Sequence, residues 1–420
     1  MSNDTKFDIV SLAKKAKQAS LQAAQLNSET KNKLLTAMAN NIIAEQNTII
    51  AENSKDISAG EAKGLSTAML DRLLLTPERI QGISDAIIDI VNLPDPVGSR
   101  SAMTNRPTGI EVGRMRIPLG VIAMIYEARP NVTAEAAALC LKSGNGVILR
   151  GGSEALHSNL AIATILHDTL KEFSLQPDMV CVVPDPDRDV IAKLLTLNQD
   201  IDLVIPRGGE GLIRYVSDNS RIPVIQHFKG VCHLFVDKYA DINKAVNILV
   251  NGKTQRPSAC NSLETLLVHQ DIAEEFLPIA ATALAEFSVK VHACEQSLGK
   301  FTGAILATDD DYDAEYLAQE IAIKQVSDYE HAIAHIQQFS SDHTEVIVTQ
   351  DYSRANEFVR RINSSVVMVN ASSRFSDGGE LGLGSEIGIS TSKLHAYGPM
   401  GLEALTTEKF VVFGEGAVRK

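Results

Sequence analysis

The chain has 420 residues, of which 45% are hydrophobic and 22% are charged. This composition is typical of a globular protein, and the length allows two or three domains, each with its own core. The formal net charge of -13 argues against nucleic acid or an anionic membrane as a partner, because both would repel the chain. An anionic ligand must therefore be held by a local cluster of donors.

The N-terminal residues and the cysteines indicate in which cellular compartment the chain works. Residues 1–6 contain no cationic segment followed by an apolar one, so we expect no secretory signal. No apolar run approaches the length of a membrane-spanning helix. The five cysteines are scattered and form no Cys-x-x-Cys pair. This pattern predicts a reducing cytoplasm, with neither a disulfide framework nor a zinc site.

The first part of the chain predicts helices. Apolar residues recur at three-to-four spacing over 11–26, 29–50 and 77–91. The stretch 93–99 contains two prolines and a glycine and ends this pattern. The following stretch, 106–116, is polar and interrupted by glycine, which is typical of a hairpin that projects from the body of a protein.

From residue 120 onward, apolar strands alternate with helices. The expected strands of the first set are 120–125, 147–149, 179–183 and 202–205, and the expected helices are 134–141, 153–173 and 187–195. A second set contains a short helix at 243–250 and strands at 265–268, 345–349 and 365–370. Continuous apolar strands between helices indicate an α/β fold with parallel sheets that are covered on both faces.

Cys260 is the first candidate for chemistry. It lies in the segment 255–265, after a polar stretch and before an apolar run that predicts a strand. A thiol at the start of a buried strand, with Arg256 nearby, is placed where a thiolate is exposed and electrostatically favoured. The alternative is that Cys260 packs as a small hydrophobic residue.

Two strand ends in the first set carry glycine turns and an arginine. A helix is expected after each turn, so backbone N–H groups there would point at a phosphate. Neither turn matches a strict Gly-x-Gly-x-x-Gly or Walker pattern, and an ordinary tight turn also uses glycine. Two such turns in one sheet favour a dinucleotide at the carboxyl ends of the strands. The residues are Arg150, Gly151, Gly152, Pro206, Arg207, Gly208 and Gly209.

Asn131 is the third candidate. It comes just after an expected buried strand and just before an Ala-rich helix. A side-chain amide in this position could donate a hydrogen bond to a developing oxyanion. The alternative is that Asn131 caps the helix.

Together these motifs resemble those of the aldehyde dehydrogenase superfamily and, within it, of the γ-glutamyl phosphate reductases. The similarity covers nearly the whole chain and rests on ordered motifs at 118–122, 127–133, 144–152, 205–209, 227–233, 255–265, 384–391 and 398–402. The resemblance implies two Rossmann-like α/β domains with parallel-sheet cores and a small oligomerisation β element. The implied boundaries are 1–99 and 117–237 for an NADP-binding domain, 238–395 for a catalytic domain, and 100–116 and 396–420 for the oligomerisation element.

The resemblance also implies roles for single residues. Cys260 matches the catalytic thiol of the family, and Asn131 matches its oxyanion-hole amide. Arg150 stands where hydrolytic relatives have a ribose-binding Lys, and Ser153 stands where many NAD-specific relatives have a Glu. Without that carboxylate there is room for a 2′-phosphate, to which Arg150 offers a cation. The implied cofactor is therefore NADPH.

One departure from the hydrolytic relatives concerns a base. They carry a Glu-Leu-Gly-Gly motif whose Glu activates water against a thioester, whereas residues 227–230 here read His-Phe-Lys-Gly. A reductase of an acyl phosphate needs no such water, so the missing carboxylate agrees with that chemistry. His227 could act as a base, because histidine titrates near neutrality, or it could be structural. Tyr397 stands where the family pattern predicts Arg, and it brings no charge for an anion.

The implied reaction is the NADPH-dependent reduction of L-glutamyl 5-phosphate to L-glutamate 5-semialdehyde and phosphate, through a thioester on Cys260, in L-proline biosynthesis. Charge complementarity suggests Lys253 and Arg256 for the departing phosphate, and Arg129 or the loop of Ser372 and Arg374 for the α-carboxylate. A solvated surface arginine is the alternative for each of these.

The expected partners are the small substrate, further copies of the chain in a homo-oligomer, and glutamate 5-kinase. We expect no metal, no nucleic acid and no membrane, and a cytoplasmic location. Two other functions remain open. One is a hydrolytic, NAD(P)-dependent aldehyde dehydrogenase, and the other is a dinucleotide-binding scaffold without catalysis.

Overall fold

The structure is a computed structural model that describes residues 7–419. The chain forms two compact units. Unit 1 is built from the chain up to Gln226, together with Leu383–Gly388 and the segment from Met400 onward. Unit 2 comprises His227–Gly382 and Ile389–Pro399. We describe each unit by itself.

Helices form the N-terminal part of unit 1. They are α1 (Ile9–Ala23), α2 (Ser28–Ala44), α3 (Gln46–Ala62), α4 (Thr67–Leu73) and α5 (Pro77–Asn92). The single helix expected over 29–50 is divided at Glu45, whose φ of -96° and ψ of 15° leave the helical region. The side chain of Asn27 starts α2 by accepting a hydrogen bond from the N–H of Thr30.

A parallel sheet is the centre of unit 1. Its strands are β3 (Val121–Tyr126), β4 (Gly146–Arg150), β5 (Val180–Val182) and β6 (Leu203–Arg207), in the order β5-β4-β3-β6. The connecting helices are α6 (Asn131–Lys142), α7 (Leu156–Glu172), α8 (Arg188–Leu194) and α9 (Glu210–Asn219), with the 3₁₀ turns η1 (Ser153–Ala155) and η2 (Pro177–Met179). Ile125 pairs with Arg150, and Tyr126 pairs with Arg207. The register therefore places both glycine turns at the same edge of the sheet.

Unit 2 contains a seven-stranded sheet in which every pair of neighbouring strands is parallel. The strands are β7 (Cys232–Val236), β8 (Leu263–His269), β9 (Lys290–Ala293), β10 (Ile305–Leu306), β11 (Glu320–Val326), β12 (Thr344–Val348) and β13 (Val366–Val369). Their order is β10-β9-β11-β8-β7-β12-β13. β7, which the expected boundary at 237 assigned to the cofactor domain, thus pairs within the sheet of unit 2.

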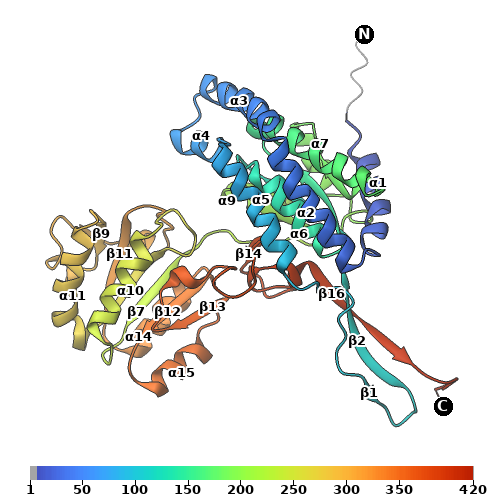
Figure 1. Cartoon of the computed structure of the whole chain (residues 1–420). Helices are drawn as coiled ribbons and strands as arrows, with labels where there is room; N and C mark the ends of the chain where they lie inside the picture. Colours follow the sequence, from blue (N-terminus) through green and yellow to red (C-terminus); the bar gives the residue numbers. More distant parts are fainter. Residues whose placement is uncertain (1–6, 420) are drawn as a thin grey trace. The chain divides into compact units, whose positions relative to one another are not determined.

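Helices cover both faces of this second sheet, as Figure 1 shows. They are α10 (Ile242–Thr254), α11 (Gln270–Ala285), α12 (Glu295–Leu298), α13 (Asp309–Tyr312), α14 (Tyr329–Phe339) and α15 (Tyr352–Arg361), followed by the 3₁₀ turn η3 (Ser373–Phe375). Leu266 packs in the core with Leu249 of α10, whereas its neighbour Leu267 packs on the other side with Ile333 of α14. Such alternation explains why the strand reads as a continuous apolar run.

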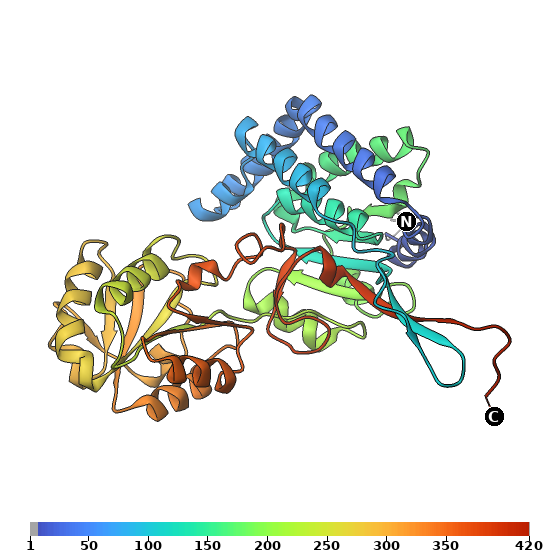
Figure 2. The same cartoon turned by 60° about the horizontal axis from the view of Figure 1, so that its bottom comes forward.

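A small antiparallel sheet projects from the body of unit 1, which Figures 1 and 2 both show. Its strands are β1 (Thr104–Asn105), β2 (Glu111–Pro118) and β16 (Thr406–Phe413), in the order β1-β2-β16. The remaining elements are β14 (Gly388–Ser390), β15 (Gly398–Met400) and the 3₁₀ turn η4 (Leu402–Leu405). The hairpin expected near 106–116 is therefore present, and the C-terminal strand joins it.

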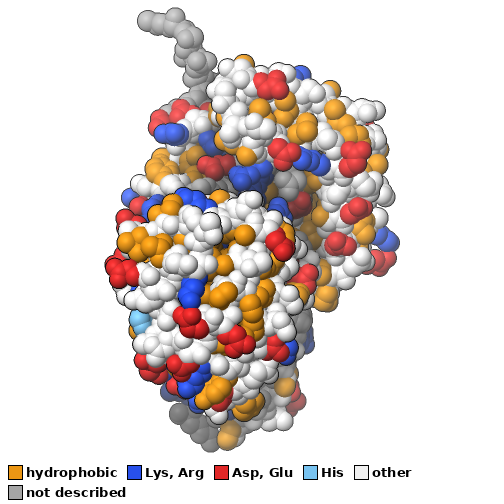
Figure 3. All heavy atoms as spheres, turned by 90° about the vertical axis from the view of Figure 1, so that its left-hand side faces the viewer, with side chains coloured by type: hydrophobic (Ala, Val, Ile, Leu, Met, Phe, Trp, Pro, Cys, Tyr) orange, Lys and Arg blue, Asp and Glu red, His pale blue; other side chains and the backbone are white. Residues whose placement is uncertain are grey.

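The surface and the helices add two observations. On the face that Figure 3 shows, acidic and basic side chains are interspersed with apolar ones, so the negative net charge is not gathered there. Among the described residues, no helix has both the length and the apolar sequence that crossing a membrane requires.

Candidate active site

Cys260 lies in the loop between α10 and β8 and is partly exposed. The loop is anchored by contacts from distant segments of unit 2. The thiol of Cys232 donates to the carbonyl oxygen of Cys260 at 3.3 Å. At the next residue, the Asn261 carbonyl accepts from Ser373 at 2.6 Å, and the Asn261 amide donates to the carbonyl of Ser376 at 2.9 Å. The backbone that carries the thiol is therefore held in one place.

Gly230 adds a steric constraint on the same loop. Its Cα lies against the backbone of Cys260, and a Cβ atom at this position would overlap the Cys260 carbonyl. The N–H of Gly230 donates to the carboxylate of Glu315 at 2.9 Å. A residue with a side chain at position 230 would have to displace the loop.

Two histidines lie beside the thiol. One ring nitrogen each of His227 and His343 and the Sγ of Cys260 all lie within 4.8 Å of one another. The two ring centroids are 4.9 Å apart. The role of His227 as a base stays a hypothesis.

His343 is fully buried, and its tautomer follows from its neighbours. Burial, together with the smaller effect of nearby His227, lowers the pKa of His343 to about 3, so the ring is neutral at neutral pH. Its Nδ1 lies 2.8 Å from the Thr344 hydroxyl, which itself donates to Ser376 at 2.8 Å. We therefore assign the ring proton to Nδ1 and a lone pair to Nε2.

Two arginines, Arg256 and Arg374, lie at or near the Cys260 loop. Arg374 donates from Nε to the side chain of Gln255 at 2.7 Å. Burial lowers the pKa of Arg374, repulsion by Arg256 lowers it further, and Cys260 acts in the opposite direction. Ser372 accepts from the N–H of Arg374 at 3.3 Å. The structure thus brings Arg374 to Gln255 and Arg256, at the start of the Cys260 loop, whereas Ser372 donates to Asn251 of α10 at 2.6 Å.

Lys253 occupies a different environment. It is completely buried, and its ammonium donates to Glu264 at 2.8 Å and to the carbonyl of Leu263 at 2.8 Å. Burial lowers the pKa of Lys253 and raises the pKa of Glu264 to about 7. Because the ammonium is buried and already donates to two acceptors of the protein, it is not accessible to a phosphate that enters from solvent. This position differs from the phosphate contact expected from charge alone.

In unit 1, Arg150 ends β4 with its guanidinium buried. It donates to the carbonyl of Gly151 at 3.1 Å and to that of Pro186 at 2.6 Å, while its Nε is buried without an acceptor. Burial lowers the pKa of Arg150. The orphaned Nε fits an anion, because a phosphate oxygen would supply the missing acceptor.

The glycine turn after β4 has a carboxylate packed against it. A Cβ at Gly152 would overlap the carboxylate of Glu154, which accepts from the N–H of Ala128 at 2.6 Å. Ser153, at the start of η1, is exposed. A side chain at position 152 would therefore displace the Glu154 carboxylate and change the turn that carries Ser153.

The turn after β6 is built in a similar way. Gly209 begins α9 without a side-chain cap, and its N–H donates to Glu127 at 3.0 Å. A Cβ at Gly208 would overlap the same carboxylate, whereas the space beside Gly209 is open. A phosphate at this helix terminus would compete with Glu127 for the N–H of Gly209.

Asn131 does not cap α6 with its side chain. It is the first residue of the helix, after Pro130, and its Nδ2 donates to Glu135 at 3.0 Å. Burial raises the pKa of Glu135, while Asn131, Arg207 and Arg129 all favour the charged carboxylate. Because an amide nitrogen has two N–H donors, Glu135 can orient Asn131 while the second N–H faces a substrate oxygen.

Sequence reasoning did not find some residues that shape the site. Glu135 follows Asn131 by four positions, a spacing that places both on one face of a helix, so a signal was present. His343 gave no such signal, because it stands alone before a buried strand.

At Tyr397, the hydroxyl donates to the carbonyl of Asn363, and burial raises its pKa to about 12, so the side chain stays uncharged.

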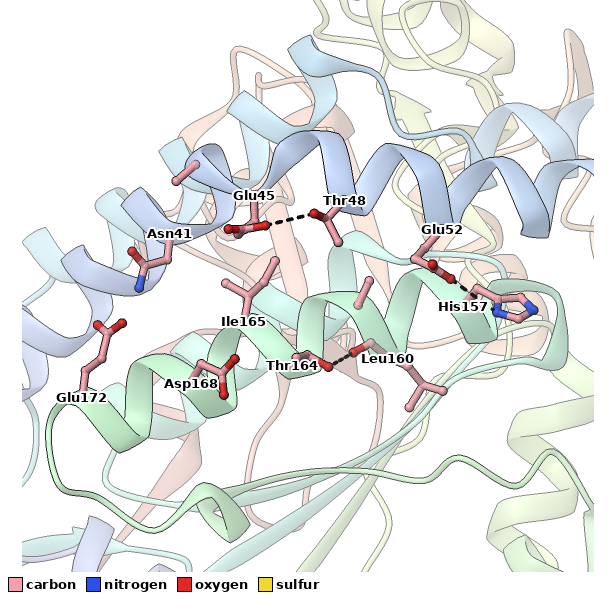
Figure 4. Close-up of a pocket in the computed structure, with 12 residues that line it drawn as sticks. Asn41, Glu45, Thr48, Glu52, His157, Leu160, Thr164, Ile165, Asp168 and Glu172 are labelled. Carbon is pink, nitrogen blue, oxygen red and sulfur yellow. Dashed lines mark hydrogen bonds and ion pairs between the residues drawn. The ribbon is translucent and has the colours of Figure 1, made fainter.

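A hollow in unit 1 lies apart from these residues. It is lined by α2, α3 and α7, and Figure 4 shows the side chains that face it. Four of them are acidic, and they are Glu45, Glu52, Asp168 and Glu172. These carboxylates would repel an acyl phosphate, so we do not assign the hollow to the chemistry.

Comparison with known proteins identifies the family. Residues 1–304 match the model of the aldehyde dehydrogenase family. The chain belongs to this family. A protein from Colwellia psychrerythraea named gamma-glutamyl phosphate reductase is 69% identical over 99% of this chain and 100% of its own length. A protein of the same name from Shewanella denitrificans is 55% identical over 100% of both chains.

A solved structure agrees with these relatives. The crystal structure of gamma-glutamyl phosphate reductase from Thermotoga maritima has a TM-score of 0.97 at 42% identity, and the match covers 99% of this chain and 100% of that one. The resemblance inferred from the motifs, the predicted fold class and the predicted class of enzyme, an oxidoreductase, are therefore confirmed.

Proposed function

We propose that the chain reduces L-glutamyl 5-phosphate to L-glutamate 5-semialdehyde and phosphate, with NADPH as the reductant, in proline biosynthesis. The observation that carries this proposal is a partly exposed thiol, Cys260, on an anchored loop that carries Arg256 and that Arg374 of η3 contacts through Gln255. The names of relatives that are up to 69% identical over nearly the whole chain support it.

In this mechanism the thiolate of Cys260 attacks the acyl carbon of the substrate. A carbon–sulfur bond forms, the bond from carbon to the phosphate oxygen breaks, and phosphate leaves. Arg256, on the same loop as Cys260, and Arg374, which interacts electrostatically with Cys260, would offset the charge of the departing phosphate. We assign the oxyanion to Asn131 and to backbone N–H groups near Cys260. The α-carboxylate has two candidate partners, Arg129 and the loop of Ser372 and Arg374.

NADPH is the proposed cofactor, with its phosphates near Arg150, Gly151, Gly152 and Ser153 and near Pro206, Arg207, Gly208 and Gly209. When bound, it would supply the hydride that converts the acyl thioester into a thiohemiacetal anion, from which the carbon–sulfur bond breaks to release the aldehyde and the Cys260 thiolate. The buried Nε of Arg150, which lacks an acceptor, supports an anion at this strand end. An exposed serine at position 153 leaves room for a 2′-phosphate.

Arg150→Ala tests this cofactor preference. We expect the KM for NADPH to rise about tenfold or more while the KM for NADH changes little, because only NADPH carries the 2′-phosphate. Equal effects on both cofactors would place the 2′-phosphate elsewhere.

A hydrolytic aldehyde dehydrogenase is the main competing function. Residues 227–230 contain no carboxylate, and the carboxylates on the neighbouring segments engage protein donors: Glu315 accepts from Gly230, and Glu264 accepts from Lys253. The deciding assay runs the reaction in the oxidative direction with glutamate semialdehyde and NADP. Our proposal requires phosphate or arsenate, and oxidation without either anion would support hydrolysis.

Cys260→Ala separates catalysis from a binding scaffold. We expect this variant to bind NADPH as well as the wild type does and to show no turnover, because the nucleophile is absent. Turnover that survives the substitution would contradict the mechanism.

Assembly into a homo-oligomer is part of the proposal. β16 is an edge strand of the small sheet, and Phe410, Val412 and Phe413 on it are more than half exposed. An open strand edge with apolar side chains is suited to pair with a second copy of the chain. Replacing Phe410 and Phe413 with Ser should lower the molar mass measured by light scattering, and an unchanged mass would argue against this surface.

Location and the upstream enzyme complete the proposal. All five cysteines lie in the described residues as thiols rather than in disulfides, which supports a reducing cytoplasm.

An association with glutamate 5-kinase would protect a labile acyl phosphate from water. Co-sedimentation of the two purified enzymes tests it directly.

A further inference from the structure

Three side chains of unit 2 have the donors and the spacing of a metal site. Among the residues that the structure describes, His227, Cys260 and His343 form a group whose ligand atoms all lie within 4.8 Å of one another. Zinc–sulfur bonds of about 2.3 Å and zinc–nitrogen bonds of about 2.0 Å place tetrahedral ligands roughly 3.3 to 3.6 Å apart. Side-chain rotations that move each atom by about an ångström would therefore close the site.

The ring of His343 is already oriented as that of a metal ligand. Its Nδ1 donates to the hydroxyl of Thr344 at 2.8 Å, and Thr344 donates onward to Ser376. Its Nε2 is the nitrogen left for a metal, and it is buried without a hydrogen-bond partner. A buried acceptor in this state lowers stability, and a bound cation would offset that cost. Outer partners such as Thr344 commonly fix the tautomer of metal-binding histidines.

We propose that His227, Cys260 and His343 bind Zn²⁺ reversibly and that the bound zinc inhibits the enzyme by occupying the Cys260 sulfur. On binding, the thiol of Cys260 releases its proton to water, a sulfur–zinc bond forms, and the ion loses water molecules. No electron is transferred. The fourth position of the ion remains for water or inorganic phosphate.

The chemistry of the three donors selects the ion. One thiolate and two imidazoles suit zinc or its analogues Co²⁺ and Cd²⁺, whereas Mg²⁺ and Ca²⁺ prefer oxygen ligands. The donors come from the start of unit 2, from the loop before β8, and from the residue before β12. This separation explains why ligand spacing in the sequence predicted no zinc site.

The inhibition rests on the proposed role of Cys260 as the nucleophile, whereas the metal binding does not. Binding is therefore measured by itself, with Co²⁺ as the probe on the full chain. We expect a thiolate-to-cobalt charge-transfer band that Zn²⁺ displaces and that Cys260→Ser abolishes. His227→Gln and His343→Gln should each weaken Co²⁺ binding about tenfold or more. His157→Gln, at an exposed position in unit 1, is the matched control and should leave the band unchanged.

Activity gives the second readout. Zn²⁺ should inhibit the wild type, EDTA should restore it, and both glutamine variants should require about tenfold more zinc relative to their own uninhibited rates. Because His343 is buried, its variant is compared only if its thermal midpoint stays near that of the wild type. The more exposed His227→Gln provides the test in any case.

The outcomes distinguish the two proposals. A band that survives Cys260→Ser, or zinc sensitivity that is unchanged in His227→Gln, would overturn the metal site. If Co²⁺ binds as expected but Cys260→Ala keeps its turnover, the site stands and the proposed mechanism fails.

Discussion

Gly230 and Cys260 touch through their backbones, and the glycine has no side chain because the carbonyl of Cys260 fills the space where one would lie. Gly230→Ala should therefore move the nucleophile. A displacement of about an ångström at reacting atoms costs on the order of 100-fold in rate, so we expect a loss of that size in kcat/KM.

The matched control for Gly230→Ala is Gly299→Ala. Gly299 has a φ of -71° and open space where a Cβ would be placed. We expect this variant to keep activity within about twofold, since exposed substitutions away from special features change stability little. Full activity in Gly230→Ala would show that the loop tolerates the shift.

Glu135 should act as a positioning residue through Asn131. Loss of an oxyanion donor costs about 100-fold or more in kcat, and Asn131→Ala should show this. Glu135→Ala leaves the amide in place but unoriented, so we expect a smaller loss of about tenfold, in kcat rather than KM. Glu135→Gln keeps an oxygen acceptor and should recover most of the activity. A purely structural role would instead lower the thermal midpoint of both variants alike.

Lys253 and Glu264 form a buried pair whose removal should affect stability. Lys253→Met leaves the Glu264 carboxylate buried without its cation, which typically costs about 3–5 kcal/mol in the free energy of unfolding. The double variant Lys253→Met and Glu264→Leu should recover much of this loss, because neither charge remains. Urea unfolding of the three proteins measures it. If Lys253 binds phosphate instead, Lys253→Met will raise the KM for the acyl phosphate without a loss of stability.

His335 should make unit 2 sensitive to acid. Burial lowers its pKa to about 2, whereas the unfolded chain has the ordinary pKa of 6.5. Below pH 6.5 the unfolded chain gains a proton that the folded ring does not accept, so stability present above 6.5 is lost as the pH falls. The loss approaches about 1.4 kcal/mol per pH unit from this residue.

His335→Phe removes this pH-dependent loss of stability while keeping an aromatic ring next to Tyr312 and Phe339. The difference in unfolding free energy between pH 7.5 and pH 5.5 should shrink by about 1 kcal/mol. His331→Gln, at an exposed position on the same helix, is the control. An identical pH dependence in His335→Phe and wild type would show that the ring is protonated in the fold.

The sequence predicted the strands of the first sheet well, because buried parallel strands read as short apolar runs between glycine turns. It did not separate α2 from α3, since apolar spacing continues through Glu45 and only its backbone angles break the helix. The Cys260 loop was recognised from its motif. The partners of that loop were not, because Ser373, Ser376 and His343 lie more than 80 positions away in the chain and meet it only through the order of strands in the sheet.

Charge alone was a weaker guide than position. Arg256, Arg374 and Lys253 carry the same charge, yet Arg256 lies on the Cys260 loop, Arg374 interacts electrostatically with Cys260, and Lys253 is buried inside the fold. What separates them is burial: Lys253 is on the last turn of α10 and faces the sheet, where Glu264 already offers a carboxylate. A cation near a motif therefore predicts a ligand contact only when its own helix leaves it exposed.

The anchors of the nucleophile loop also have a consequence for synthesis. Asn261 is tied to Ser373 and Ser376, which follow it by more than 110 residues. A growing chain on the ribosome carries its thiol long before these two serines exist. The loop can reach its final geometry only when nearly the whole polypeptide has been made, so reactivity at the thiol and completion of the chain are coupled in time.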